Sequence, residues 1–321
     1  MRGHCCLLVL AVTSLLIGMG RLGSALADEA FVTDQQANAI SVVDLTTQAV
    51  VATISVAGHP AGIAMTRDGL MAYVTSPDGH SLSVIDTAAR QVIRRIVLGG
   101  EPVGVTASPS GLVYVADWIS DRVLVVDPVA GRVVTQIQVG RSPSGLAVTS
   151  DGTLLVCADR LDDRVSLVSL PDNTVVATVA VGRHPFGIVL DDQGRAFAAD
   201  VESNDVAVID LASRRLLTLI PTGPRPYVVA LSIDHGFVTN ELGGSVTVFD
   251  LRTLKATGTV DVGAYPEGVQ VDHRGHVYVV NWMDDTVMIV DEQTLAVSGE
   301  IKVGASPRAF GTFIRFMSPP P

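Results

Sequence analysis

The fold is decided by residues 262–268, which read VGAYPEG, because the chain repeats this pattern along its whole length. Seven copies centre on one proline each: Pro60, Pro102, Pro143, Pro185, Pro226, Pro266 and Pro307. The intervals between successive prolines are 42, 41, 42, 41, 40 and 41 residues. Six copies read Gly-x-x-Pro, and the first has Ala57 in place of the glycine. A fixed period of about forty residues indicates a repeat architecture.

Each period contains four short runs of β-branched and apolar residues. In the period that starts at Pro102 they are residues 103–107, 112–116, 123–126 and 132–137, separated by segments rich in Gly, Pro, Asp and Ser. Such runs and boundaries are typical of strands and turns, and helical periodicity is missing from residues 28–321. Six of the seven third runs end in an acid, which we expect to cap the following turn: Asp44, Asp86, Asp127, Asp210, Asp250 and Asp291, with Ser169 as the exception.

Four antiparallel strands in each of seven repeats predict an all-β, seven-bladed β-propeller of four-stranded antiparallel blades. The first repeat begins with a second-strand segment at 31–33, and the chain ends with a first-strand segment at 308–314. We therefore expect the C-terminal strand to pair into the N-terminal blade, which removes the open sheet edges. Residues 28–316 are predicted to be one propeller domain and 317–321 a disordered tail.

Residues 1–27 are predicted to be a secretory signal peptide, with Arg2 before an apolar run and Ala25-Leu26-Ala27 as the cleavage site. We therefore expect a periplasmic protein, with no membrane span after cleavage and in the monomeric state. Cleavage changes the net charge from −11 to −13, which argues against a nucleic-acid surface. Cys157 is then the one remaining cysteine, so no intramolecular disulfide is expected, and its apolar neighbours predict a buried thiol.

Second-strand motifs carry a family resemblance. Residues 73–76 read YVTS, 237–240 FVTN and 278–281 YVVN, with Gly-x-x-Pro-x-Gly before them and Val-x-Val-x-Asp after them. Over residues 28–321 the sequence resembles the YVTN-family β-propeller proteins. The resemblance implies an exported seven-bladed propeller that serves in binding, in some cases beside periplasmic quinone or haem redox enzymes, and it supplies no catalytic residue.

Candidate site residues come from comparing equivalent positions of the seven repeats. The loops that join blades and the loops between strands two and three share one face, where we expect variable side chains to bind a partner protein or small ligand. The candidates lie directly before or after the prolines, or at the first loop position after a second strand: His59, Glu101, Trp118, Arg160, His184, Phe186, Arg225, Tyr227, Tyr265, Glu267, Trp282 and Arg308. Four acids at the end of the second strands are instead expected to cap loops: Asp34, Asp117, Asp159 and Asp200.

No catalytic triad, haem-attachment or phosphate-binding motif is found, so we expect a binding protein without a cofactor rather than an enzyme. The alternative is a metal-assisted hydrolase or lactonase with its site in the central channel. Its divalent metal would be held by residues facing one another around the channel: His59, His184, Glu101 and Glu267.

Overall fold

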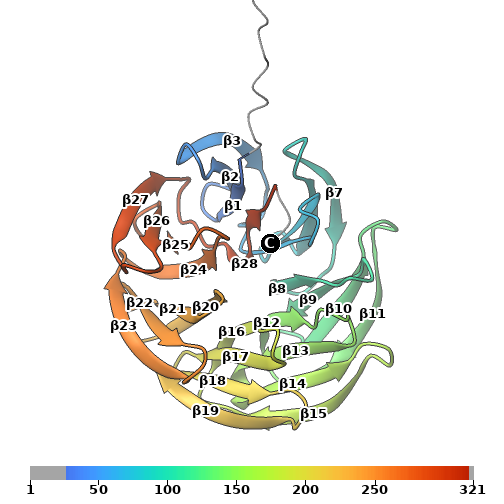
Figure 1. Ribbon diagram of the computed structural model, residues 1–321. Coiled ribbons are helices and arrows are strands. Elements are labelled where there is room, and N and C mark those ends of the chain that lie inside the picture. The colour runs from blue at the N-terminus through green and yellow to red at the C-terminus, as the bar shows by residue number, and fades with distance from the viewer. Residues whose placement is uncertain (1–26, 318–321) are drawn as a thin grey trace, which may run out of the picture.

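The β-branched runs form strands, and the strands form seven sheets arranged as blades around a central axis (Figure 1). The computed structural model describes residues 27–317. Within each blade, neighbouring strands are antiparallel and follow the order of the chain. The predicted all-β, seven-bladed propeller is confirmed. The described residues contain one helix, the single 3-10 turn Arg160–Asp162.

Strands at equivalent places form four layers around the axis. The innermost strands of blades 2 to 7 are β4 (Gly62–Met65), β8 (Pro102–Ala107), β12 (Pro143–Val148), β16 (Pro185–Leu190), β20 (Pro226–Leu231) and β24 (Pro266–Val271). The second strands of blades 1 to 7 are β1 (Glu29–Asp34), β5 (Met71–Ser76), β9 (Val113–Asp117), β13 (Leu154–Asp159), β17 (Arg195–Asp200), β21 (His235–Asn240) and β25 (His276–Asn281).

The third strands of blades 1 to 7 are β2 (Ala39–Asp44), β6 (Ser81–Asp86), β10 (Arg122–Asp127), β14 (Arg164–Ser169), β18 (Asp205–Asp210), β22 (Ser245–Asp250) and β26 (Thr286–Asp291). The outer strands are β3 (Ala49–Ser55), β7 (Gln91–Val97), β11 (Arg132–Gln138), β15 (Thr174–Ala180), β19 (Arg215–Pro221), β23 (Lys255–Asp261) and β27 (Val297–Lys302). Two short strands, β28 (Phe310–Thr312) and β29 (Ile314–Arg315), follow at the C-terminus.

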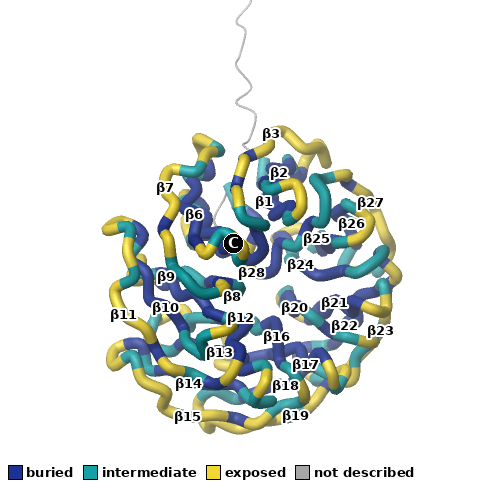
Figure 2. The backbone as a smooth tube through the Cα atoms, turned by 180° about the vertical axis from the view of Figure 1, so that it is seen from behind, coloured by how far each residue is buried: buried dark blue, intermediate teal, exposed yellow. Residues whose placement is uncertain are grey.

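Burial is lowest in the outer strands at the rim, as Figure 2 shows. The second and third strands are almost wholly buried, because both faces of each blade pack against neighbouring blades. Each outer strand buries one apolar side chain near its end: Ile54, Ile96, Ile137, Val179, Ile220, Val260 and Ile301. The hydrophobic core is therefore a ring of clusters between adjacent blades. Cys157 lies in one of these clusters as a free buried thiol, as predicted, and burial raises its pKa.

The acids at the ends of the third strands cap turns, as predicted. Asp44 Oδ1 accepts hydrogen bonds from the backbone N–H groups of Thr46 and Thr47, at 2.9 and 2.8 Å. Equivalent bonds are made by Asp86, Asp127, Asp210, Asp250 and Asp291. In the exceptional blade, the Ser169 hydroxyl donates to Asp172 instead.

The C-terminal segment closes the ring, as predicted, but as two short strands rather than one. Pro307 forms a bridge with Asp34, and β29 pairs antiparallel with β1 of the first blade. Between these two contacts with blade 1, the segment approaches blade 2, where β28 pairs in parallel with β4. Gly311 permits this contact, because a Cβ atom there would lie 2.1 Å from the carbonyl oxygen of Ile63. The segment therefore fastens two blades.

The predicted signal peptide, residues 1–27, falls outside the described residues except for its last residue, and so do residues 318–321 of the predicted tail. Met317, the first residue of that tail, donates its backbone N–H to Asp28 Oδ1 at 2.8 Å. Among residues 27–317, no helix has the length and apolar character needed to cross a bilayer.

Candidate functional site

The propeller has two faces, and each surrounds one mouth of the central channel. The Pro-loop mouth is formed by the loops that join blades, together with the loops between second and third strands. The turn-face mouth is formed by the turns between first and second strands. All twelve candidate residues from the sequence belong to loops or strand ends on the Pro-loop side.

Aromatic side chains cluster at the Pro-loop mouth. The rings of Phe186 and Tyr227 stack with their centroids 4.0 Å apart, and Phe310 contacts Phe186 edge-on at 5.5 Å. Trp118 lies 6.0 Å from Phe186. Such offset and edge-on pairs add packing energy beyond the area that they bury. We call Trp118, Phe186, Tyr227 and Phe310 the aromatic plug.

A buried ion pair is packed against the aromatic plug. The guanidinium of Arg308 donates two hydrogen bonds to Glu267, at 2.6 and 2.8 Å, and a third to the Tyr227 hydroxyl at 3.4 Å. Burial acts to lower the pKa of Arg308, but the Glu267 carboxylate reverses this effect and raises it above its usual value. Burial also raises the pKa of the Tyr227 hydroxyl. The guanidinium of Arg308 and the carboxylate of Glu267 therefore neutralise each other within the protein.

Three other predicted residues each lie near the carboxylate of an adjacent loop. His59 contacts Asp78 at 2.5 Å, and His184 lies 3.9 Å from Glu202. Arg225 pairs with the partly buried Glu241 at 3.1 Å.

The remaining four lie in exposed or half-buried positions. Tyr265 and Trp282 lie 6.0 Å apart, and Arg160 lies over the Trp118 ring at 5.2 Å from its centroid. Glu101 is exposed. As binding residues, all twelve candidates stay predictions.

The proposed metal ligands are not brought together. The histidines face carboxylates of other residues, and Glu267 is committed to Arg308. Within the described chain, no three His, Cys, Asp or Glu side chains converge in a way that suits a metal ion. This geometry offers no support for a metal-assisted hydrolase in the channel.

The buried acids at the ends of the second strands brace the Pro loops, in agreement with their expected structural task. Asp200 Oδ2 accepts the backbone N–H of Gly182 at 2.9 Å, and Asp117 Oδ1 accepts that of Glu101 at 3.0 Å. A Cβ atom at Gly140 would lie 2.3 Å from the carboxylate of Asp159. The close approach of a strand-end side chain therefore requires this glycine in five of the seven copies, whereas a Cβ atom at Gly99 would meet nothing within 4 Å and the first copy has Ala57.

Burial perturbs these acids. It raises the pKa of Asp34 to about 7, against the opposing hydrogen bonds from Ser41. It raises the pKa of Asp200 to about 9, with a further contribution from the neighbouring carboxyl of Asp205. In blades 3 and 4 an arginine occupies the position of Asp205, and it pairs with the strand-end acid. Blade 5 therefore holds a carboxyl–carboxylate pair in place of an ion pair.

A second set of loop residues was missed in the sequence. Five Asn or Asp residues in left-handed backbone conformation accept the N–H of the residue before a proline, always 21 residues further along the chain, at 2.7–3.0 Å. The acceptors are Asn38, Asp121, Asp163, Asn204 and Asp285. Asn and Asp are enriched in this conformation, so their fixed spacing was a readable signal.

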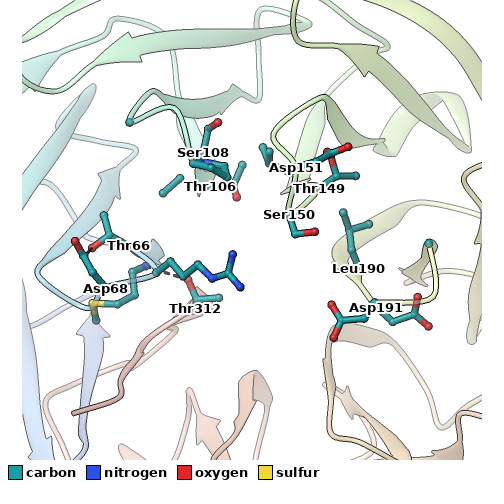
Figure 3. Close-up of a pocket in the computed structure, with 18 of the residues that line it drawn as sticks. Thr66, Asp68, Thr106, Ser108, Thr149, Ser150, Asp151, Leu190, Asp191 and Thr312 are labelled. Carbon is teal, nitrogen blue, oxygen red and sulfur yellow. Dashed lines mark hydrogen bonds between the residues drawn. The ribbon is translucent and has the colours of Figure 1, made fainter. Parts of the chain in front are cut away.

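A large cavity lies at the turn-face mouth, opposite the mouth that the sequence predicted as the binding face. Figure 3 shows its labelled side chains arranged around an open centre. This funnel has a volume of about 1210 Å³ and is lined by turns of blades 2 to 5 and by Thr312. The first-strand ends supply apolar groups, and the turns supply hydroxyl groups and carboxylates.

A narrower channel continues from the funnel along the axis. It has a volume of about 380 Å³ and is lined by the inner strands β8, β12, β16, β20 and β24 and by β28. Four residues line both the funnel and the channel: Thr106, Val148, Leu190 and Thr312. At its far end the channel meets Phe186 and Phe310 of the aromatic plug. Funnel and channel together form a pocket that runs from the turn face along the axis to these two rings.

The sequence held a signal for this pocket as well. The second residue after each of the strands β4, β8, β12, β16, β20 and β24 varies as strongly in type as the residues beside the prolines. All six of these residues are exposed. They are Arg67, Pro109, Ser150, Asp192, Ile233 and His273. Variation at turn positions that are exposed at a channel mouth therefore indicates a binding surface as well as a structural role.

Comparison with known proteins agrees with the fold. The model of the YNCE-like beta-propeller family matches residues 20–110. No curated protein matches the sequence.

Three solved structures share the architecture at low sequence identity, so they show the fold alone. A chain of Kuenenia stuttgartiensis hydrazine synthase is 18% identical with a TM-score of 0.71, covering 78% of this chain and 88% of its own. A functionally unknown protein from Desulfotomaculum acetoxidans DSM 771 is 15% identical with a TM-score of 0.77, covering 88% and 99%. The dihydro-heme d1 dehydrogenase NirN, in complex with DHE, is 14% identical with a TM-score of 0.67, covering 91% and 76%. The chain is thus a seven-bladed repeat propeller, and its residues 20–110 match the YNCE-like beta-propeller family.

Proposed function

We propose that this chain is an exported, non-enzymatic binding protein that holds a small ligand in the funnel and channel of the turn face. The observation that carries the proposal is a pocket that runs from the turn face along the axis and is lined at depth by Phe186 and Phe310. Concave sites with apolar walls and a few polar groups are the usual form of a small-molecule site. Export is proposed from the predicted signal peptide. The absence of a cofactor also stays a prediction, and metal analysis of the purified protein tests it.

A channel-filling variant tests the ligand proposal. Ala147 lies on the wall of the channel, so Ala147→Trp places an indole where the ligand would lie. Protein purified from the periplasm is compared by native mass spectrometry and by extraction of bound small molecules. We expect a bound species on the wild type that Ala147→Trp loses. The matched control is Thr135→Trp on the exposed outer strand β11, which should keep it.

Two outcomes contradict this assignment. A ligand that survives Ala147→Trp, in a protein with an unchanged circular dichroism spectrum, does not lie in the channel. A ligand lost on Arg225→Ala or Trp282→Ala, but kept by Ala147→Trp, lies at the Pro-loop mouth.

A second candidate function is docking of a partner protein on the Pro-loop face. Four blades expose an aliphatic side chain at one equivalent loop position: Ile119 (60% exposed), Leu161 (43%), Leu242 (52%) and Met283 (58%). Repeated exposed apolar groups on one face favour contact with a protein surface. Two of the solved structures with this fold belong to redox enzymes, so we propose a periplasmic quinone or haem redox enzyme as the partner.

Replacement of these four residues by serine tests the docking proposal. The expected result is loss of a cross-linked redox enzyme from periplasmic extracts, while the ligand extracted from the channel is unchanged. Capture of the same enzyme by the quadruple variant would count against this surface.

A further inference from the structure

Most polar side chains of the funnel are already committed to their own turns. The Thr66 hydroxyl donates to Asp68 at 2.6 Å, and the Thr149 hydroxyl donates to Asp151 at the same distance. These bonds help to lower the pKa of both carboxyl groups. Ser108 contacts Ser110 at 3.1 Å, and Asp191 pairs with Arg195 at 2.6 Å. Such groups stabilise the turns and are poorly placed to recognise a ligand.

Four polar side chains of the funnel differ, because no hydrogen bond or ion pair within residues 27–317 engages them. Each comes from a different one of four consecutive blades: Arg67 from blade 2, Thr106 from blade 3, Ser150 from blade 4 and Asp192 from blade 5. Thr106 lies at the junction of funnel and channel, since it lines both. Figure 3 shows Thr106 and Ser150 at the same open centre. The unengaged groups are therefore one cation, two hydroxyls and one anion, in that order around the rim.

The two charges lie on opposing walls. Blades 2 and 5 are three steps apart in a ring of seven, and the hydroxyls of blades 3 and 4 lie between them. The funnel's volume of about 1210 Å³ leaves room for a ligand that reaches from one wall to the other. A ligand that meets both charges must therefore carry opposite charges that are several ångström apart. A free α-amino acid is too short, whereas an extended tripeptide spans about 10 Å at about 3.3–3.6 Å per residue.

We propose that the ligand of this pocket is a short zwitterionic peptide with free termini, an inference that rests on the ligand-binding function proposed above. Arg67 binds the C-terminal carboxylate, for which its guanidinium fork is suited. Asp192 binds the N-terminal ammonium group. Thr106 and Ser150 bond to the peptide groups between, and one side chain enters the apolar throat at Val148 and Leu190.

Calorimetric titration with one peptide and its blocked forms tests the inference. The probe is Ala-Leu-Ala with free termini, compared with its N-acetyl, C-amide and doubly blocked forms. Each single block removes the charge on which one of these hydrogen bonds depends. We therefore expect each single block to weaken binding about tenfold or more, and the double block to abolish measurable binding.

Variants assign each terminus to its residue. Arg67→Gln should bind the free peptide and its C-amide equally, while it still discriminates against the N-acetyl form. Asp192→Asn should show the converse pattern. Both residues are exposed, so folding should be unaffected. Arg183→Gln and Asp172→Asn are control substitutions at exposed sites outside the funnel, and they should leave all four affinities unchanged.

The outcomes separate this inference from the function on which it rests. If Ala147→Trp releases a native ligand but no form of the peptide binds, or all forms bind equally, the peptide assignment is overturned and the ligand-binding function stands. If Ala147→Trp releases nothing, the ligand-binding function fails. Peptide binding that neither Arg67→Gln nor Asp192→Asn changes also overturns the assignment.

Discussion

Residue types vary among the repeats at both mouths of the channel, but the variable side chains serve different purposes at the two mouths. At the Pro-loop mouth, Glu267, Arg308 and Tyr227 differ from their equivalents in other blades, yet they bond to one another, with Glu267 buried and the other two half-buried. At the turn-face mouth, Arg67 and Asp192 also differ from their equivalents but bond to nothing in the described chain. A residue that differs among the repeats can therefore serve packing or ligand binding. The two roles are distinguished by whether its side chain already bonds to other residues of the protein.

Removal of the closing segment should have the largest effect, because it dismantles both mouths. A chain truncated after Ser306 loses Arg308 and Phe310 at one mouth, and Thr312 and β29 at the other. The first and second blades then expose unpaired edges. We expect a fall of more than about 10 °C in the thermal unfolding midpoint, measured by circular dichroism. An unchanged midpoint would contradict the closure described here.

Breaking the buried ion pair should come next. Arg308→Met leaves Glu267 buried without a counter-charge, which costs about 3–5 kcal/mol of unfolding free energy. Adding Glu267→Leu removes that charge, so the double variant should regain most of the loss. Urea denaturation of both variants and the wild type checks this order. A double variant that is less stable than Arg308→Met would show that the pair is not self-contained.

The carboxyl pair of blade 5 predicts a pH dependence. The folded-state pKa of Asp200 is about 9, well above the usual value near 3.9, so the folded protein holds a proton that the unfolded chain releases. The resulting stability is fully present below about pH 4 and is lost as the pH rises towards 9. Between pH 5 and 8, this group contributes a slope of about −1.4 kcal/mol per pH unit.

Asp200→Asn should remove that slope, and urea denaturation at several pH values measures it. The control, Asp192→Asn, concerns an exposed acid of the same blade and should keep the wild-type slope. Equal slopes in all three proteins would rule out a protonated Asp200.

The smallest effect is expected at the turn-face mouth. Arg67→Ala removes an exposed charge without an ion-pair partner among residues 27–317, so the unfolding free energy should change by less than about 0.5 kcal/mol. A loss comparable with that of Arg308→Met would mean that the two mouths do not differ in the way described.

The fold could be predicted from the sequence because its signals are local and repeat seven times. The prolines, the turn acids and the β-branched runs each specify one turn or strand, and the period arranges them. The break between β28 and β29 could not be predicted, because it depends on Gly311 meeting Ile63, 248 residues earlier in the chain.

The candidate site was harder to predict for a similar reason. Glu267 and Arg308 stand 41 residues apart, at equivalent positions of neighbouring repeats, and nothing local shows that their side chains meet. The depth of the channel likewise depends on ring packing, since Phe186 and Phe310 come from strands 124 residues apart. Sequence comparison found the variable positions beside the prolines, but not which mouth their side chains would close.

The position of β28 and β29 also bears on the order of events during biosynthesis. The ribosome delivers β1–β27 before the segment that completes the circle, and chains fold from the N-terminus as they emerge. Until the last residues arrive, the inner edges of blades 1 and 2 are open. The nascent polypeptide is therefore an unclosed array until its last residues pair with blades 1 and 2.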